Sequence, residues 1–167
     1  MELNRLEPLD MARGMFRKIL VAVDGSEPSN RALKYAAELA LRFGAELRVL
    51  VVVPKVMLPA FPNEGIGTVP AALYSEVDRY QERARAAYQK VLEDSIRVVR
   101  ETHPEVRVEG VLREGRPSST IVEMADKEGV DLIVMGSRGL GGIMGWVLGS
   151  TSRRVVDSCT KPILVVK

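Results

Sequence analysis

Cysteine and histidine are almost absent from this chain of 167 residues, which holds one of each, Cys159 and His103. A lone cysteine excludes a disulfide within the chain, and with a single histidine the usual zinc ligand sets cannot be assembled. Nothing in the pattern places His103 beside a nucleophile, so no catalytic triad is indicated. We therefore expect no metal site, no dedicated catalytic residue and a reducing, cytoplasmic compartment.

Long apolar runs, aromatic residues and an excess of one charge are missing as well. The longest apolar runs, such as Val49–Val53 and Leu132–Met135, are far shorter than the about 20 residues that a membrane-spanning helix needs. Aromatic residues make up 5% of the chain, and 24 basic residues are interspersed with 22 acidic ones. A nucleic-acid binder usually gathers its basic residues on one face and stacks aromatic rings on bases. We expect neither a membrane span nor a nucleic-acid partner.

The first fifteen residues differ from the rest of the chain. They carry Glu2, Glu7 and Asp10 and lack the apolar core of a signal peptide. Because the length is that of a single domain, we predict a flexible arm over residues 1–15 and one domain over residues 16–167.

Within that domain, short β-branched runs alternate with longer segments of helical periodicity. Strands are predicted at Ile19–Val23, Leu47–Val53, Val106–Leu112, Asp131–Met135 and Pro162–Val166. The first helix has Ser26 as its N-cap and Gly44 as its stop, and the third begins at Pro117 and ends before Gly129. A fourth, short helix is expected over residues 151–159.

The second helix is predicted from apolar residues that recur at steps of three and four. These residues are Leu73, Val77, Tyr80, Ala84, Ala87 and Val91. On the polar side of the same helix, Glu93 and Arg97 have the spacing of an i,i+4 ion pair.

This alternation of strands and helices is typical of βαβ units, and hence of a parallel sheet with helices on both faces. The continuously apolar runs Val49–Val53 and Leu132–Met135 fit strands that are covered on both sides. We predict an α/β domain with an open five-stranded parallel sheet, strand order 3-2-1-4-5, in the Rossmann-like class. In such sheets ligands bind at the carboxyl ends of the strands, where the strand order reverses.

One segment fits neither a strand nor a helix. Residues 54–70 contain four prolines and two glycines and follow the second strand. A loop of this length is usually functional or disordered. Two interpretations stay open: a segment that covers a ligand or binds a partner, and a flexible connection.

Glycines are concentrated directly after the fourth strand, between Gly136 and Thr151. Backbone N–H groups in such a segment can converge on phosphate oxygens, and the missing Cβ atoms let a ligand approach the backbone. Gly149, Ser150 and Thr151 immediately precede the last helix, whose N-terminus favours anions, and Arg138 adds a planar cation. The segment is not a Walker A motif. We interpret it as a phosphate site rather than as a merely flexible loop.

A carboxylate follows the first strand, at Asp24 in the sequence Ala22-Val23-Asp24-Gly25-Ser26. Taken alone, it would be a residue that caps the next turn. In the predicted strand order, however, the first and fourth strands are neighbours, so Asp24 and Gly136 should face each other across one crevice. There Asp24 could accept hydrogen bonds from a ribose hydroxyl or from water around a metal ion.

With these residues the chain resembles the nucleotide-binding branch of the universal stress protein family, whose motif is G-x2-G-x9-G-[ST]. Gly136, Gly139, Gly149 and Ser150 reproduce that spacing. The resemblance covers about residues 16–167. It implies the fold of the adenine nucleotide alpha hydrolase-like proteins, and ATP, with Mg²⁺, as the ligand. A spacer with three further glycines, Gly141, Gly142 and Gly145, and with Trp146 departs from the family pattern.

The resemblance also assigns roles to single residues. It implies that Asp24 contacts the ribose, that the backbone of Ala22 and Val23 lies beside the base, and that the backbone of Val52 recognises adenine. It implies that Gly136, Arg138 and Gly139 form a turn that binds phosphate, and that Gly149, Ser150 and Thr151 form a clamp at the helix terminus. Met135, otherwise a gap-filling residue, is included in the site. The implied set is Ala22, Val23, Asp24, Val52, Met135, Gly136, Arg138, Gly139, Gly149, Ser150 and Thr151.

The implied function is a nucleotide-dependent regulatory module of the stress response. The alternative is an enzyme on the same fold, either a slow ATPase or an adenylate-transferring relative. The last strand, Pro162–Val166, is predicted at the edge of the sheet with little charge to protect it, and family members commonly dimerise through it. We therefore expect a homodimer with Ile163 and Val165 at the interface.

Overall fold

The computed structural model describes residues 14–56, 71–140 and 148–167. It contains one parallel sheet in the order β3-β2-β1-β4-β5, as the sequence predicts. Its strands are β1 (Lys18–Ala22), β2 (Glu46–Pro54), β3 (Val108–Gly115), β4 (Leu132–Gly136) and β5 (Ile163–Val166). Residues 1–13 of the predicted arm, residues 57–70 of the loop and the spacer glycines with Trp146 lie outside the described residues.

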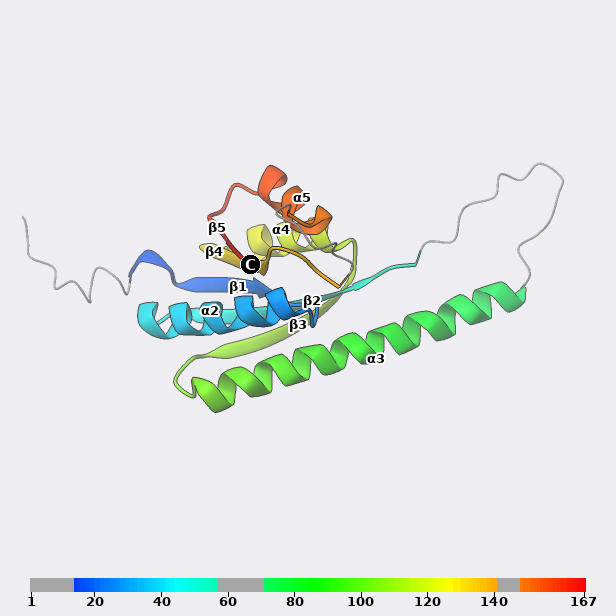
Figure 1. Cartoon of the computed structure of the whole chain (residues 1–167), viewed down its shortest axis with the longest axis horizontal. Coiled ribbons are helices and arrows are strands. Elements are labelled where there is room, and N and C mark those ends of the chain that lie inside the picture. Colours follow the sequence, from blue (N-terminus) through cyan, green and yellow to red (C-terminus); the bar gives the residue numbers. More distant parts are fainter. Residues whose placement is uncertain (1–13, 57–70, 141–147) are drawn as a thin grey trace, which may run out of the picture.

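Helices cover both faces of the sheet (Figure 1). They are α2 (Glu27–Phe43), α3 (Ala71–Thr102), α4 (Pro117–Glu128) and α5 (Ser150–Ser158). Because side chains alternate along a strand, Ile19 and Val21 pack toward α2 and α3, while Leu20 between them packs toward α4 and α5. The sheet therefore lies between two apolar layers, and only its strand ends and outer edges are open for a site.

The predicted N-cap of α2 and the predicted ends of α2 and α4 are confirmed. The Ser26 hydroxyl accepts a hydrogen bond from the Ser29 N–H at the start of α2. Gly44 and Gly129 end α2 and α4 as left-handed C-caps. The prediction for β3 is displaced along the chain, because the Val106 N–H donates to the His103 carbonyl in the turn after α3 and the strand begins only at Val108.

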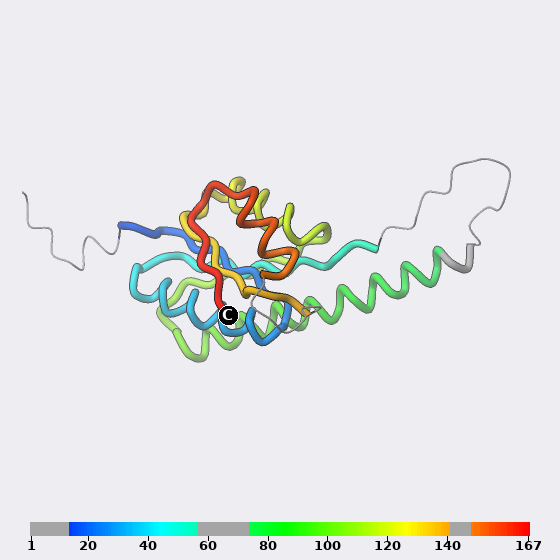
Figure 2. The backbone as a smooth tube through the Cα atoms, turned by 45° about the horizontal axis from the view of Figure 1, so that its top comes forward, coloured from blue at the N-terminus to red at the C-terminus, as the bar shows by residue number. Residues whose placement is uncertain are grey.

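Only part of the apolar stripe predicted for α3 is buried. With 32 residues the helix is about 48 Å long, whereas the nine residues of β2 span about 30 Å, so α3 extends past the sheet (Figures 1 and 2). Tyr80 is 62% exposed and Ala87 is exposed, whereas Leu92 and Val99, nearer the end of the helix, are buried. The apolar spacing therefore predicts the helix, but Tyr80 and Ala87 do not belong to the core.

The ion pair predicted between Glu93 and Arg97 is also wrong. Arg97 binds Asp94 instead, at 2.5 Å, and Glu93 accepts a hydrogen bond from Gln89 at 2.8 Å. Residues three and four positions apart are both neighbours on a helix, so spacing alone does not select one partner.

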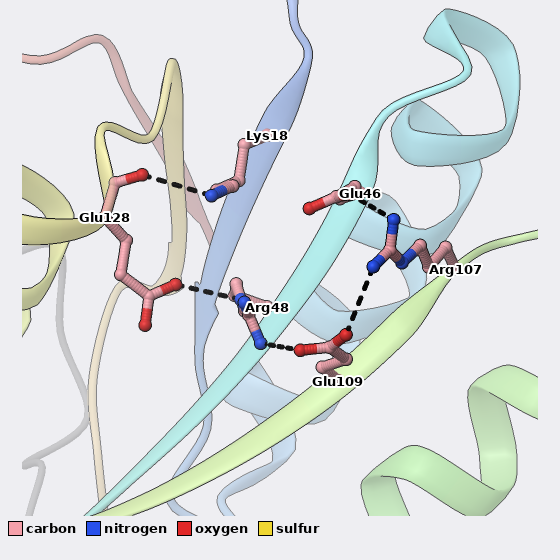
Figure 3. Close-up of polar contacts among 6 residues, drawn as sticks. All are labelled: Lys18, Glu46, Arg48, Arg107, Glu109 and Glu128. Atoms are coloured by element: carbon pink, nitrogen blue, oxygen red, sulfur yellow. Dashed lines mark hydrogen bonds and ion pairs between the residues drawn. The ribbon is translucent and has the colours of Figure 1, made fainter.

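A network of charged side chains crosses β2 and β3 near their amino-terminal ends (Figure 3). Arg48 lies 2.8 Å from Glu128, the last residue of α4, and also binds Glu109 of β3. Arg107 binds Glu46 at 2.7 Å and Glu109 at 3.7 Å. The contact between Arg48 Nε and Glu128 Oε2 is an ion pair without hydrogen-bond geometry. The network ties the end of α4 to the two strands beside it.

Candidate functional site

A cavity of about 290 Å³ opens at the carboxyl ends of the central strands. Its walls come from β1, β2 and β4, from the starts of α2, α4 and α5, and from α3. All eleven residues singled out in the sequence line it: Ala22, Val23, Asp24, Val52, Met135, Gly136, Arg138, Gly139, Gly149, Ser150 and Thr151. The structure thus brings together residues that lie up to 129 positions apart in the sequence.

One side of the cavity is apolar. Leu50, Val52 and Met135 reach it from β2 and β4, and Ile121 reaches it from α4. All four belong to the core between the sheet and helices α4 and α5. This wall is therefore an extension of the core, and it suits an apolar group of a ligand.

The polar side of the cavity contains Asp24. Its Oδ1 atom accepts hydrogen bonds from the Ser26 N–H at 3.0 Å and the Ser26 hydroxyl at 2.6 Å. Its Oδ2 atom accepts one from the Leu140 N–H at 3.2 Å. The Asp24 N–H donates to the Ser29 hydroxyl at 3.3 Å. Asp24 therefore does cap its turn, and it also contacts the glycine-rich segment after β4.

Two glycines of the predicted phosphate turn serve the packing of the chain on itself. A Cβ atom on Gly136 would lie 2.8 Å from the Ser29 nitrogen, and one on Gly139 would collide with Asp24 Oδ2. These two glycines therefore have a packing role beside the predicted contact with a ligand, since both also line the cavity. They let β4 approach the start of α2 and let residues 138–140 approach Asp24.

The N-terminus of α5 completes the polar side. The Gly149 N–H donates to the Ser137 carbonyl at 2.8 Å, and the buried Ser152 hydroxyl donates to the Gly136 carbonyl at 2.9 Å. No side chain caps the helix at Gly149. The first N–H groups of a helix have no partner within it and attract anions. With Ser150 and Thr151 on the cavity, α5 is placed to bind a negatively charged group.

Several residues of the cavity were not predicted. They are Ser29, Leu50, Pro54, Tyr88, Pro117, Ile121, Leu140 and Ser152. Leu140 and Ser152 are next to predicted residues, so the motif could have included them. Tyr88, Pro117 and Ile121 are contributed by α3 and α4, and their places depend on how these helices pack, which no local pattern shows.

The cavity offers few groups for acid–base or metal chemistry. Asp24 is the one carboxylate among the described residues that line it, and these include no histidine, cysteine, lysine or glutamate. Over the described parts of the chain, no cluster of three potential metal ligands occurs. In the same ranges, no helix is long and apolar enough to cross a membrane.

Comparisons with known proteins agree with this geometry. Residues 15–167 match the model of the universal stress protein family. The universal stress protein YxiE of Bacillus subtilis is 35% identical over 153 residues, which are 92% of this chain and 100% of that protein. Among solved structures, the universal stress protein UspA from Lactobacillus plantarum is similar with a TM-score of 0.75 and 26% identity, over 90% of this chain and 97% of that one.

A structure with the same fold contains a nucleotide. It is the universal stress protein from Archaeoglobus fulgidus in complex with dAMP, with a TM-score of 0.58 and 22% identity, over 92% of this chain and 99% of that one. The family match covers the whole sheet and every residue of the cavity. On this evidence the chain belongs to the universal stress protein family.

Proposed function

We propose that this protein binds an adenine nucleotide, ATP in the first instance, in the cavity at the carboxyl ends of β1 and β4. The observation that carries the proposal is the division of the cavity into the apolar wall of Val52 and Met135 and the polar side of Asp24, Arg138 and the start of α5. A base is bound by an apolar slot, whereas phosphates are bound by N–H groups and cations. The dAMP complex of a protein with the same fold supports this ligand class.

Each part of the nucleotide has residues to receive it. The base would lie along the apolar wall beside the backbone of Val52, and Asp24 would accept hydrogen bonds from the ribose. Arg138 and the N–H groups at the start of α5 would bind the phosphates. Mg²⁺ is held in many nucleotide sites by phosphate oxygens, water and one or two carboxylates. Because Asp24 is the one carboxylate among the described lining residues, Mg²⁺ would be held mainly by the phosphates themselves.

We further propose that the nucleotide regulates the protein rather than serving as the substrate of a fast reaction. Asp24 is the one carboxylate among the described lining residues, which include no histidine, cysteine, lysine or glutamate, and in this proposal it binds the ribose rather than an attacking water. Slow hydrolysis, assisted by Arg138, is the enzymatic alternative.

The single cysteine fits a reducing, cytoplasmic compartment, which is part of this proposal.

The same proposal includes a homodimer through β5. This strand is at the edge of the sheet and pairs only with β4 in the described chain. Ile163, Leu164 and Val165 are only partly buried. An apolar edge with open backbone groups favours pairing with a second copy.

The test of nucleotide binding is a thermal shift with ATP and Mg²⁺, together with mass spectrometry of nucleotide released from the purified protein. At 100 times its dissociation constant a ligand stabilises a protein by about 2.7 kcal/mol, or roughly 5–11 °C in Tm for a domain of this size.

Variants at Gly149 test whether the stabilisation by ATP comes from binding in the cavity. A Cβ atom at Gly149 would lie 3.3 Å from the Arg138 Cα atom, so Gly149→Val should displace the turn at Arg138 and abolish the rise in Tm. Gly149→Ala adds only the Cβ atom and should keep part of the rise in Tm that ATP causes. An unchanged ATP response in Gly149→Val would refute the site.

A further inference from the structure

Tyr88 brings α3 to the cavity, although α3 packs on the face of the sheet opposite the apolar wall. The contact that fixes α3 here lies one turn further along the helix. A Cβ atom on Gly25 would lie 3.2 Å from Val91 Cγ2, so α3 packs directly against the residue after Asp24. Tyr88 precedes Val91 by three residues and so shares its helix face. Tyr88 and Asp24 accordingly line the same cavity, and the charge of Asp24 acts on Tyr88.

The hydroxyl of Tyr88 is placed to act as a hydrogen-bond donor. A phenol, whose pKa is ordinarily about 10, is protonated at neutral pH and can donate a hydrogen bond. Burial, then the charge of Asp24 and then that of Tyr80 raise the pKa of Tyr88 further. In residues 14–56, 71–140 and 148–167 this hydroxyl has no hydrogen-bond partner. A partly buried O–H group without a partner gains free energy when a ligand provides one.

Asp24 and Tyr88 complement each other chemically. The Asp24 carboxylate can only accept hydrogen bonds, whereas the Tyr88 hydroxyl can donate one and accept others. The two hydroxyl groups of a ribose each donate and accept. A sugar held at Asp24 therefore lies next to a second group that can bind it from the α3 side.

We propose that the Tyr88 hydroxyl binds the ribose hydroxyl groups of the nucleotide together with Asp24, and so contributes to the recognition of the sugar. This inference rests on the proposed function, because it assigns a further residue to the same site. It also gives the helix that extends past the sheet a direct contact with the bound ligand.

The experiment measures the dissociation constants of ATP and of 2′,3′-dideoxy-ATP, which lacks both ribose hydroxyls, by calorimetry with Mg²⁺ present. Three proteins are compared: wild type, Tyr88→Phe and Tyr80→Phe. Tyr88→Phe keeps the ring and removes only the hydroxyl. Tyr80 lies on the same helix but is 62% exposed and does not line the cavity, so it is the matched control.

If Tyr88 binds the ribose, Tyr88→Phe weakens ATP binding by about 2- to 12-fold, the effect of one neutral hydrogen bond. It leaves the binding of dideoxy-ATP unchanged, and Tyr80→Phe changes neither constant. Equal ATP affinity in wild type and Tyr88→Phe would overturn the assignment, as would an equal loss for both nucleotides. A wild type that binds neither nucleotide would instead overturn the nucleotide site itself, and this assignment with it.

Discussion

The Asp24 carboxylate joins the turn after β1 to the segment after β4, because its Oδ2 atom accepts a hydrogen bond from the Leu140 N–H at 3.2 Å. Its other oxygen is held by Ser26. Each carboxylate oxygen can accept two hydrogen bonds, so Oδ2 can still receive one from a ligand. A ribose hydroxyl bound there would share an acceptor atom with Leu140. Ligand binding at Asp24 and the position of residues 138–140 are therefore linked.

Asp24→Ala should weaken ATP binding by about 10- to 100-fold. A hydrogen bond to a charged group contributes about 1.5–3 kcal/mol, and the substitution removes the one carboxylate among the described residues of the cavity. The measurement is the dissociation constant by isothermal titration calorimetry.

Asp126→Ala is the control for this prediction. Asp126 is an exposed acid near the end of α4 and does not line the cavity. Its removal changes the net charge by the same amount and should leave ATP affinity unchanged. Equal losses in the two variants would show that the effect is one of overall charge and not of the site.

The sequence predicts the fold and the cavity for the same physical reason. Parallel strands have their carboxyl ends at one edge, so residues that follow β1, β2 and β4 must meet there once the strand order is known. Asp24 and Gly136 could be placed in this way, whereas the place of Val52 in the site is implied by the resemblance to the family. The cavity residue Tyr88 could not, because its position depends on the packing of α3 against Gly25.

Arg48→Met should destabilise the fold by about 1–3 kcal/mol. The side chains of Arg48 and Glu128 are 22% and 23% exposed, and removal of the cation leaves a largely buried carboxylate without its ion-pair partner. Breaking a fully buried pair costs about 3–5 kcal/mol, and the residual exposure lowers that cost. Urea unfolding measures the loss.

The double variant Arg48→Met, Glu128→Gln separates this cause from a general loss of packing. It removes the unpaired charge and should recover part of the stability that the single variant loses. If it is less stable than Arg48→Met alone, the carboxylate of Glu128 is not the reason for the loss.

Asp131 should make the stability of the fold depend on acid pH. Burial acts to raise its pKa, but hydrogen bonds from the N–H groups of Arg17 and Lys18, with the charges of Arg17 and Lys161, outweigh burial and lower the pKa. A lowered pKa in the folded state means that the stabilisation is present above the unfolded value of about 3.9 and is lost as the pH falls through the folded value.

Asp131→Asn tests this dependence, because it keeps an acceptor oxygen and removes the charge. At pH 7 the variant should be less stable by about 1 kcal/mol, a value that allows for solvent screening, and its Tm should fall by roughly 2–4 °C. The difference from wild type should shrink below pH 4, whereas Asp126→Asn should follow wild type throughout. A difference that stays constant down to pH 2 would contradict the prediction.

Val165→Pro should convert a dimer into a monomer without breaking the sheet. The carbonyl groups of Pro162 and Val166 accept hydrogen bonds from Ile133 and Ser137 of the neighbouring chain segment. Because backbone groups alternate in direction along a strand, the N–H group of Val165 points away from β4, to the open edge. Proline at position 165 therefore removes a donor from the edge and spares the pairing of β5 with β4.

Light scattering at micromolar concentration should show a dimer for wild type and a monomer for the variant, with the thermal response to ATP retained as evidence of folding. A monomeric wild type, or a variant that is still dimeric, would show that β5 is not the interface.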